Sequence, residues 1–395
     1  MIKLLILFLL SLTTMQNMNS SLLLAKSNTL NSSDISDIEF ELNSTIEELL
    51  TNLDLGNVDS TYIDEYKVFG NTTFKEKVLD LLKGNYFDNY DGLFSAILSL
   101  LFDGVASILP LLLMILAISI LSSILNNVKS DSKYNVSSII NFVCMAVIIS
   151  ILAINFKEVI SKTINCLSTM KSQMDTLFPV LLTLMTAIGG TVSVGIYKPV
   201  VAMLTTFISS LFESVLLPIF VMIFLFTIIG SLSPNVKLNK FTGFLNSAFK
   251  WIVGFVFTIF SAILTMQGIS AGKFDGVSIK ASKYAIKSYV PIIGGYISEG
   301  FDFVMMGSML IKNAIGVGGL LILILSIISP IIQIVIFKLG LQLISGMVEA
   351  TNNNEMSSMI HNCSKILTLP IVILLGVAFM YILTIALIMC TVSVI

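Results

Sequence analysis

Long apolar runs dominate the chain from about residue 94 to its C-terminus. Seven of them have the length of a membrane span: 105–125, 136–154, 177–197, 215–232, 251–267, 314–337 and 366–394. A hydrocarbon core about 30 Å thick is crossed by roughly 20 apolar residues in a helix. Only helices and closed barrels satisfy their backbone hydrogen bonds there, and a barrel would show short alternating segments instead. The pattern predicts an all-α polytopic integral membrane protein with about seven to eight transmembrane helices, over residues 94–395.

Two further apolar segments, 199–212 and 291–310, are short or carry acidic residues. Irregular or broken helices are tolerated at membrane depth only where they are buried in protein or line water. Each segment is therefore expected to be a half-helix, a re-entrant hairpin or an additional span.

The N-terminus has the pattern of a signal peptide. One lysine, Lys3, precedes a short apolar core, and small and polar residues follow it. An apolar core of this length is too short for a span, so residues 1–25 are predicted to be a signal peptide, with an uncleaved signal anchor as the alternative.

Residues 26–93 contain fourteen acids and five lysines. Apolar residues recur there at helical spacing, which predicts a small, acidic, extracytoplasmic helical domain, with a soluble spacer as the alternative. The loop after the first span carries Lys129 and Lys133, and the positive-inside rule places it in the cytoplasm.

Composition supports the membrane assignment, since 55% of the residues are hydrophobic, 12% are charged and the mean hydropathy is +0.95. The four cysteines form no CxxC pair, and no nucleotide-binding, dinucleotide-binding or zinc-protease motif is present. The sequence 268–272, GISAG, matches the GxSxG pattern, but here the serine leaves a membrane helix rather than a strand. We therefore expect no enzymatic activity, no catalytic residue, no metal, no cofactor and no nucleic-acid partner.

Charged residues inside apolar segments are the candidate functional residues. An acid within a span costs about 2.5–3.5 kcal/mol, so it normally faces a bundle interior or water. Glu213 separates two apolar halves, and it is predicted either to line a conduit or to mark a helix break at the membrane surface. Glu299 and Asp302 share a helical face beside several glycines, and Lys312 follows as their candidate ion-pair partner.

Three lysines recur at helical spacing in a separate segment. Lys280, Lys283 and Lys287 are interleaved with apolar residues. This pattern is typical of a basic amphipathic helix that lies on an anionic membrane surface, or that docks a partner such as an ATPase.

Three stretches resemble the stage III sporulation protein AE family of endospore-forming bacteria. They are KSQMDTLFPVLLTLMTAIGG (171–190), KFDGVSIKASKYAIKSYVPIIGGYISEGFD (273–302) and IKNAIGVGG (311–319). The resemblance implies a polytopic protein of the mother-cell membrane around the engulfed forespore. It also implies partners, namely the other stage III sporulation A proteins, a separate ATPase subunit among them, and stage II sporulation protein Q of the forespore.

The resemblance further implies a role in a channel, or feeding tube, between the two cells. Two other classes of function stay open on the sequence alone. A secondary transporter for an ion or small metabolite fits the intramembrane Glu213, and a non-conducting scaffold for ring-forming partners fits a chain without catalytic residues.

Overall fold

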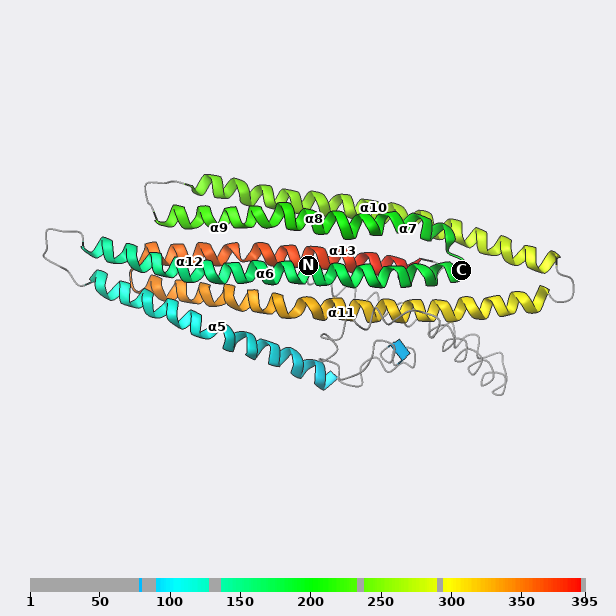
Figure 1. Cartoon of the computed structure of the whole chain (residues 1–395), viewed down its shortest axis with the longest axis horizontal. Helices are drawn as coiled ribbons and strands as arrows, with labels where there is room; N and C mark the ends of the chain where they lie inside the picture. The colour runs from blue at the N-terminus through cyan, green and yellow to red at the C-terminus, as the bar shows by residue number, and fades with distance from the viewer. Residues whose placement is uncertain (1–77, 80–89, 128–135, 233–237, 290–293, 392–395) are drawn as a thin grey trace.

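The computed structural model describes residues 78–79, 90–127, 136–232, 238–289 and 294–391. The predicted signal peptide and nearly all of the predicted acidic domain lie outside these ranges. The described residues form helices and no strand, and the long helices lie side by side along one axis (Figure 1). The chain is therefore an all-α polytopic membrane protein.

The helices are few and long, and their bounds are as follows: α5 Tyr90–Asn127, α6 Val136–Ala187, α7 Thr191–Met203, η1 Leu204–Ile208, α8 Ser209–Leu211, η2 Phe212–Leu216, α9 Leu217–Leu232, α10 Asn239–Tyr289, α11 Gly294–Ala350, α12 Asn354–Ile366 and α13 Thr368–Cys390. Six stretches of helix in the described residues are long and apolar enough to cross a membrane. At 1.5 Å per residue the 57-residue α11 is about 85 Å long, nearly three times the thickness of a hydrocarbon core.

Helix α6 joins the predicted span 136–154 to the first part of the predicted span 177–197. The segment between them stays helical because its apolar residues, such as Phe156, Leu167 and Met174, recur at helical spacing on the buried face. The helix ends inside the second predicted span, at Ala187. Gly189 follows with a φ of 89°, a conformation that residues with a Cβ rarely adopt, and the chain turns into α7.

The two segments expected to be half-helices, re-entrant hairpins or additional spans are parts of longer helices. Residues 199–212 lie within a stretch of helix from Thr191 to Leu232, which contains two π-helical turns, η1 and η2, and no break. Residues 294–310 begin α11, which continues through 314–337. The glycines of that region do not interrupt the helix.

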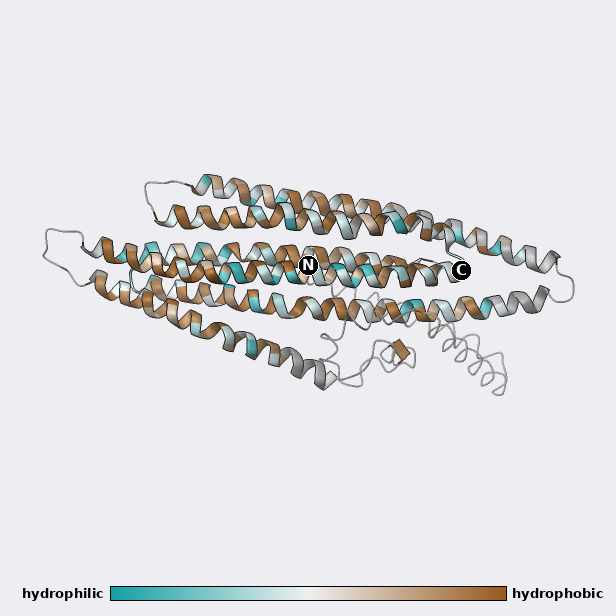
Figure 2. Ribbon diagram, viewed as in Figure 1, coloured by the Kyte–Doolittle hydropathy of each residue, from teal (hydrophilic) through white to brown (hydrophobic). Residues whose placement is uncertain are grey.

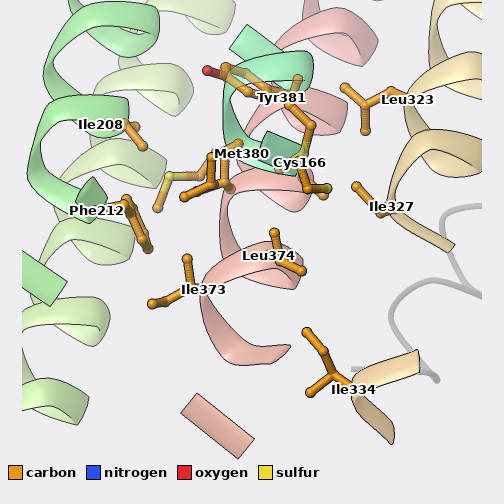
Figure 3. Close-up of a cluster of buried hydrophobic side chains, with 14 of the residues drawn as sticks. Cys166, Ile208, Phe212, Leu323, Ile327, Ile334, Ile373, Leu374, Met380 and Tyr381 are labelled. Carbon is orange, nitrogen blue, oxygen red and sulfur yellow. The ribbon is translucent and has the colours of Figure 1, made fainter. Parts of the chain in front are cut away.

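The interior of the bundle is apolar. Side chains from α6, the α7–α9 stretch, α11 and α13 meet in one cluster, part of which Figure 3 shows around Met380 and Phe212. Aromatic stacking extends this core, with the rings of Phe156 and Phe224 3.8 Å apart. Figure 2 shows the same distribution, with apolar residues along α9 and α13 and polar residues recurring along α6.

A buried polar network fastens the α11–α12 turn to α5 and α6. The Asn353 side chain caps α12 by accepting from the Met356 N–H, and it also donates to Ser122 and to Asn141. Hydrogen bonds of this kind replace those that buried polar groups lose with water. The network therefore fixes the position of the α11–α12 hairpin relative to the α5–α6 hairpin.

Candidate functional site: a polar strip and two grooves

The outward face of α6 changes character along the helix. Between Ile139 and Ile154 the exposed large side chains are apolar. Beyond them the exposed positions are mostly polar or charged, and we call this set the polar strip: Lys157, Glu158, Ser161, Asn165, Ser168, Ser172 and Asp175. Beside the strip, the Nζ atom of Lys162 lies 2.7 Å from the carboxylate of Glu158, an i,i+4 ion pair that is exposed and therefore weak.

The outward face of α10 is apolar at the same level of the bundle. The Phe257 ring of α10 packs on Phe379 of α13, with centroids 5.3 Å apart. The next residues of α13, Met380 and Tyr381, lie beside Cys166 of α6 (Figure 3). α13 thus contacts both helices and fixes their relative level. Near this level α6 exposes the polar strip. At the same level α10 exposes four large apolar side chains: Trp251, Phe255, Ile259 and Met266.

A groove of about 530 Å³ runs beside the strip, between α6 and α7. Its lining contains one acid, one lysine and several threonines: Asp175, Thr183, Thr186, Lys198, Thr205 and Thr206. The groove therefore widens the polar face of the bundle from α6 onto α7.

A larger groove, of about 1060 Å³, lies between the α9–α10 pair and the α12–α13 pair. Lys250 and Lys365 line it, together with Glu355 and several amides and hydroxyls. The larger groove is formed by helices from distant parts of the chain, which is why the sequence alone gave no sign of it.

Glu213 and Asp302, two of the acids predicted from the sequence, do not form a cluster with Lys312. Glu213 is exposed within the π-helical turn η2, so its predicted helix break is wrong, because the helix continues past it. Asp302 is half-buried on α11, and the Glu299 side chain lies outside the described residues. Neither Glu213 nor Asp302 lines the two grooves.

Lys312 is fully buried and caps the end of another helix. Its ammonium group donates to the Met389 carbonyl at 3.1 Å and to the Thr391 carbonyl at 2.8 Å. These are carbonyls at the C-terminal end of α13, where a positive charge is favourable. The predicted pairing with Asp302 is wrong, because ten residues of helix place the two about 15 Å apart along α11.

A second buried charge was not predicted. Asp275 of α10 is fully buried, and its carboxylate accepts from the backbone N–H groups of Val192 (3.1 Å) and Ser193 (3.3 Å) at the start of α7. A carboxylate at a helix N-terminus satisfies donors that have no partner within the helix. The only signal in the sequence was an acid in a lysine-rich amphipathic segment.

The lysine-rich segment itself is helical. Lys280 is exposed on α10, and the helix continues to Tyr289, so the backbone places Lys283 and Lys287 near the same face. The side chains of Lys283 and Lys287 lie outside the described residues, and docking to lipid or to a partner stays a prediction. Ser270 of the GxSxG pattern lies within the same helix, and no three metal-ligating side chains converge among the residues that the structure describes.

Comparison with known proteins adds to this geometry. The family model for stage III sporulation protein AE matches residues 72–392. The chain belongs to the stage III sporulation protein AE family. The stage III sporulation protein AE of Bacillus subtilis (strain 168) is 25% identical over 271 residues, which cover 67% of this chain and 68% of that relative. No solved structure matches the chain.

Membership of the stage III sporulation protein AE family assigns the chain a role in sporulation. Together with the six apolar stretches of helix, it identifies a multi-pass membrane protein of a sporulation protein family. The polar strip and the two grooves are therefore features of a membrane protein, in which exposed polar groups need an explanation.

Proposed function

We propose that this protein is the polytopic component of a channel complex between mother cell and forespore, needed for forespore development after engulfment. It resides in the mother-cell membrane around the forespore. Its partners are the other stage III sporulation A proteins, including a separate ATPase subunit, and stage II sporulation protein Q. The chain carries no nucleotide-binding motif, so in this proposal the energy comes from the ATPase subunit.

The observation that carries the proposal is the contrast between the outward faces of α6 and α10. Charged and amide side chains are costly against lipid, by about 2.5–3.5 kcal/mol for each charge. An apolar face on α10 suits lipid, whereas the polar strip on α6 at the same level suits water or the polar surface of a neighbouring subunit. A helical bundle with these two faces has the form expected of a subunit that lines a shared conduit.

The conduit would lie beside the bundle rather than through it. Within the part of the chain that the structure describes, apolar side chains from α6, α11 and α13 fill most of the interior, and Figure 3 shows part of this cluster. Neighbouring copies or partner helices would supply the opposite wall. The same filled interior also favours a second candidate function, in which the polar strip is only a docking face of a non-conducting scaffold.

Replacing polar strip residues tests whether this face is used. In a strain that carries Asn165→Leu and Ser168→Leu, we expect engulfment to finish normally and sporulation efficiency to fall about tenfold or more, as a loss of about 1.4 kcal/mol in assembly would produce. The matched control is Ser150→Leu with Ala153→Leu, two exposed positions at the same spacing in the apolar half of α6.

Immunoblotting and fluorescence microscopy would first establish that both variants reach normal levels at the forespore membrane. The control strain is expected to sporulate like the wild type. Normal sporulation of the Asn165→Leu, Ser168→Leu strain would show that the polar strip faces neither a conduit nor a partner.

A further inference from the structure

The larger groove changes from polar to apolar along its length. At one end, where α9 finishes and α10 and α12 begin, hydroxyls, amides and one carboxylate line it: Ser231, Thr242, Asn246, Asn354, Glu355 and Ser358. At the other end the lining is mostly apolar: Ile223, Val253, Ile366, Leu369 and Val372. A molecule with a polar end and an apolar end matches this gradient.

Two lysines lie between the polar and the apolar ends. Lys250 of α10 and Lys365 of α12 are exposed within the groove. Neither has a carboxylate within ion-pair distance among the residues that the structure describes. The one acid of the groove, Glu355, accepts a hydrogen bond from the Asn141 amide of α6 at 3.1 Å. The net charge of the lining is therefore positive, with its positive groups next to apolar surface.

A further polar atom lacks a partner within the described residues. The side-chain oxygen of Asn246 is buried and accepts no hydrogen bond there. Asn246 lies one helical turn before Lys250 on α10, so the two side chains point to the same side of the helix. A hydroxyl group of a bound molecule, placed beside an anionic group at Lys250, would satisfy this oxygen.

We propose that this groove binds one anionic glycerophospholipid. Lys250 and Lys365 hold the phosphate, the polar end of the groove holds the headgroup, and an acyl chain lies along Val253, Leu369 and Val372. The outward face of α10 supports a lipid as the occupant, because Phe244, Trp251 and Phe255 are exposed there and need an apolar solvent. Basic pockets between membrane helices bind anionic lipid headgroups by the same chemistry.

Trp251 is a fluorescent probe beside this groove, because its neighbour Lys250 lines it. It is the only tryptophan of the chain, it is 78% exposed and it follows Lys250 in α10. The full-length protein would be placed in phosphatidylcholine nanodiscs that contain a small, varied fraction of brominated phosphatidylglycerol or of brominated phosphatidylcholine. We expect brominated phosphatidylglycerol to quench Trp251 fluorescence at a far lower lipid fraction than brominated phosphatidylcholine does. The expected preference for the anionic lipid is about fivefold for each lysine.

Two variants and one control locate the site. Lys250→Gln with Lys365→Gln removes the charge and should abolish the preference. Gly254→Phe should abolish it too, because Gly254 lines the groove, a Cβ there meets nothing within 4 Å, and the larger side chain would fill the acyl-chain end. Lys157→Gln with Lys162→Gln changes the net charge equally but lies on α6, and it should keep the preference.

Three results would overturn the proposal. They are equal quenching by the two brominated lipids, a preference that survives in the Lys250→Gln, Lys365→Gln variant, and full competition by inorganic phosphate, which would show a site for a free anion. All variants would first be required to melt within the error of the wild type in the same nanodiscs. The proposal does not depend on the channel function, since it concerns a groove that contains no residue of the polar strip and is tested with purified protein.

Discussion

Lys312→Glu is expected to remove most of the folded protein from the membrane. The substitution places a buried carboxylate against the carbonyls of Met389 and Thr391, which now accept hydrogen bonds from the lysine. A buried charge without a partner costs about 3–5 kcal/mol, and the negative end of the α13 dipole adds to that cost. The hydrogen bond between Thr391 and Tyr197, 2.9 Å long, links the same helix end to α7, so the damage should spread to a third helix.

The measurement is the protein level in sporulating cells, with the melting temperature of the purified variant in detergent. The control is Lys162→Glu, the same chemical change at a lysine on the surface of α6. That change turns an exposed i,i+4 ion pair into a repulsion worth only a few tenths of a kcal/mol. If the two variants behaved alike, Lys312 would not be capping α13.

Gly319→Leu is expected to destabilise the contact between α6 and α11. A Cβ atom at Gly319 would lie 3.0 Å from the Cδ1 atom of Leu177 and closer still to its Cδ2 atom. Small residues allow membrane helices to approach this closely, and overfilling a packed interface costs about 1–3 kcal/mol. Gly319→Ala should be milder, because the end of the Leu177 side chain can move away.

The matched control lies on the same helix. Gly346 is exposed on α11, and a Cβ there would meet no atom within 4 Å, so Gly346→Leu should leave stability unchanged. Melting temperatures in one detergent would compare the three variants with the wild type. A Gly319→Leu protein that melted with the wild type would mean that α6 and α11 do not pack in this way.

Hydrophobic patterning was enough to predict the class of the fold and the presence of helices in every described apolar run. It did not predict how far the helices extend. The residues between 154 and 177 contain lysines and acids and separate two predicted spans, yet α6 continues through them as one helix. Length limits from a flat bilayer do not apply to a helix that packs against other long helices.

The candidate site was less accessible to sequence reasoning. Charges such as Glu213 stand out in an apolar run, but a sequence does not show which face of a helix they occupy. Asp275 and Lys312 have their roles because helix ends from distant parts of the sequence, the start of α7 and the end of α13, lie next to them. The larger groove likewise needs the arrangement of four helices, whereas the resemblance to the family was visible in three short stretches.

Thiol labelling of the polar strip in sporulating cells would test the central claim most directly. The four native cysteines would be replaced, Ser168→Cys would mark the strip, and Ile259→Cys would mark the apolar face of α10 as the control. We predict that a membrane-impermeant, charged thiol reagent admitted to the space between the two cells labels Ser168→Cys, leaves Ile259→Cys unlabelled, and stops late gene expression in the forespore. Labelling of Ser168→Cys without any fall in that expression would contradict the conduit and favour the scaffold. Equal labelling of both positions, or of neither, would contradict the contrast between a polar face on α6 and an apolar face on α10.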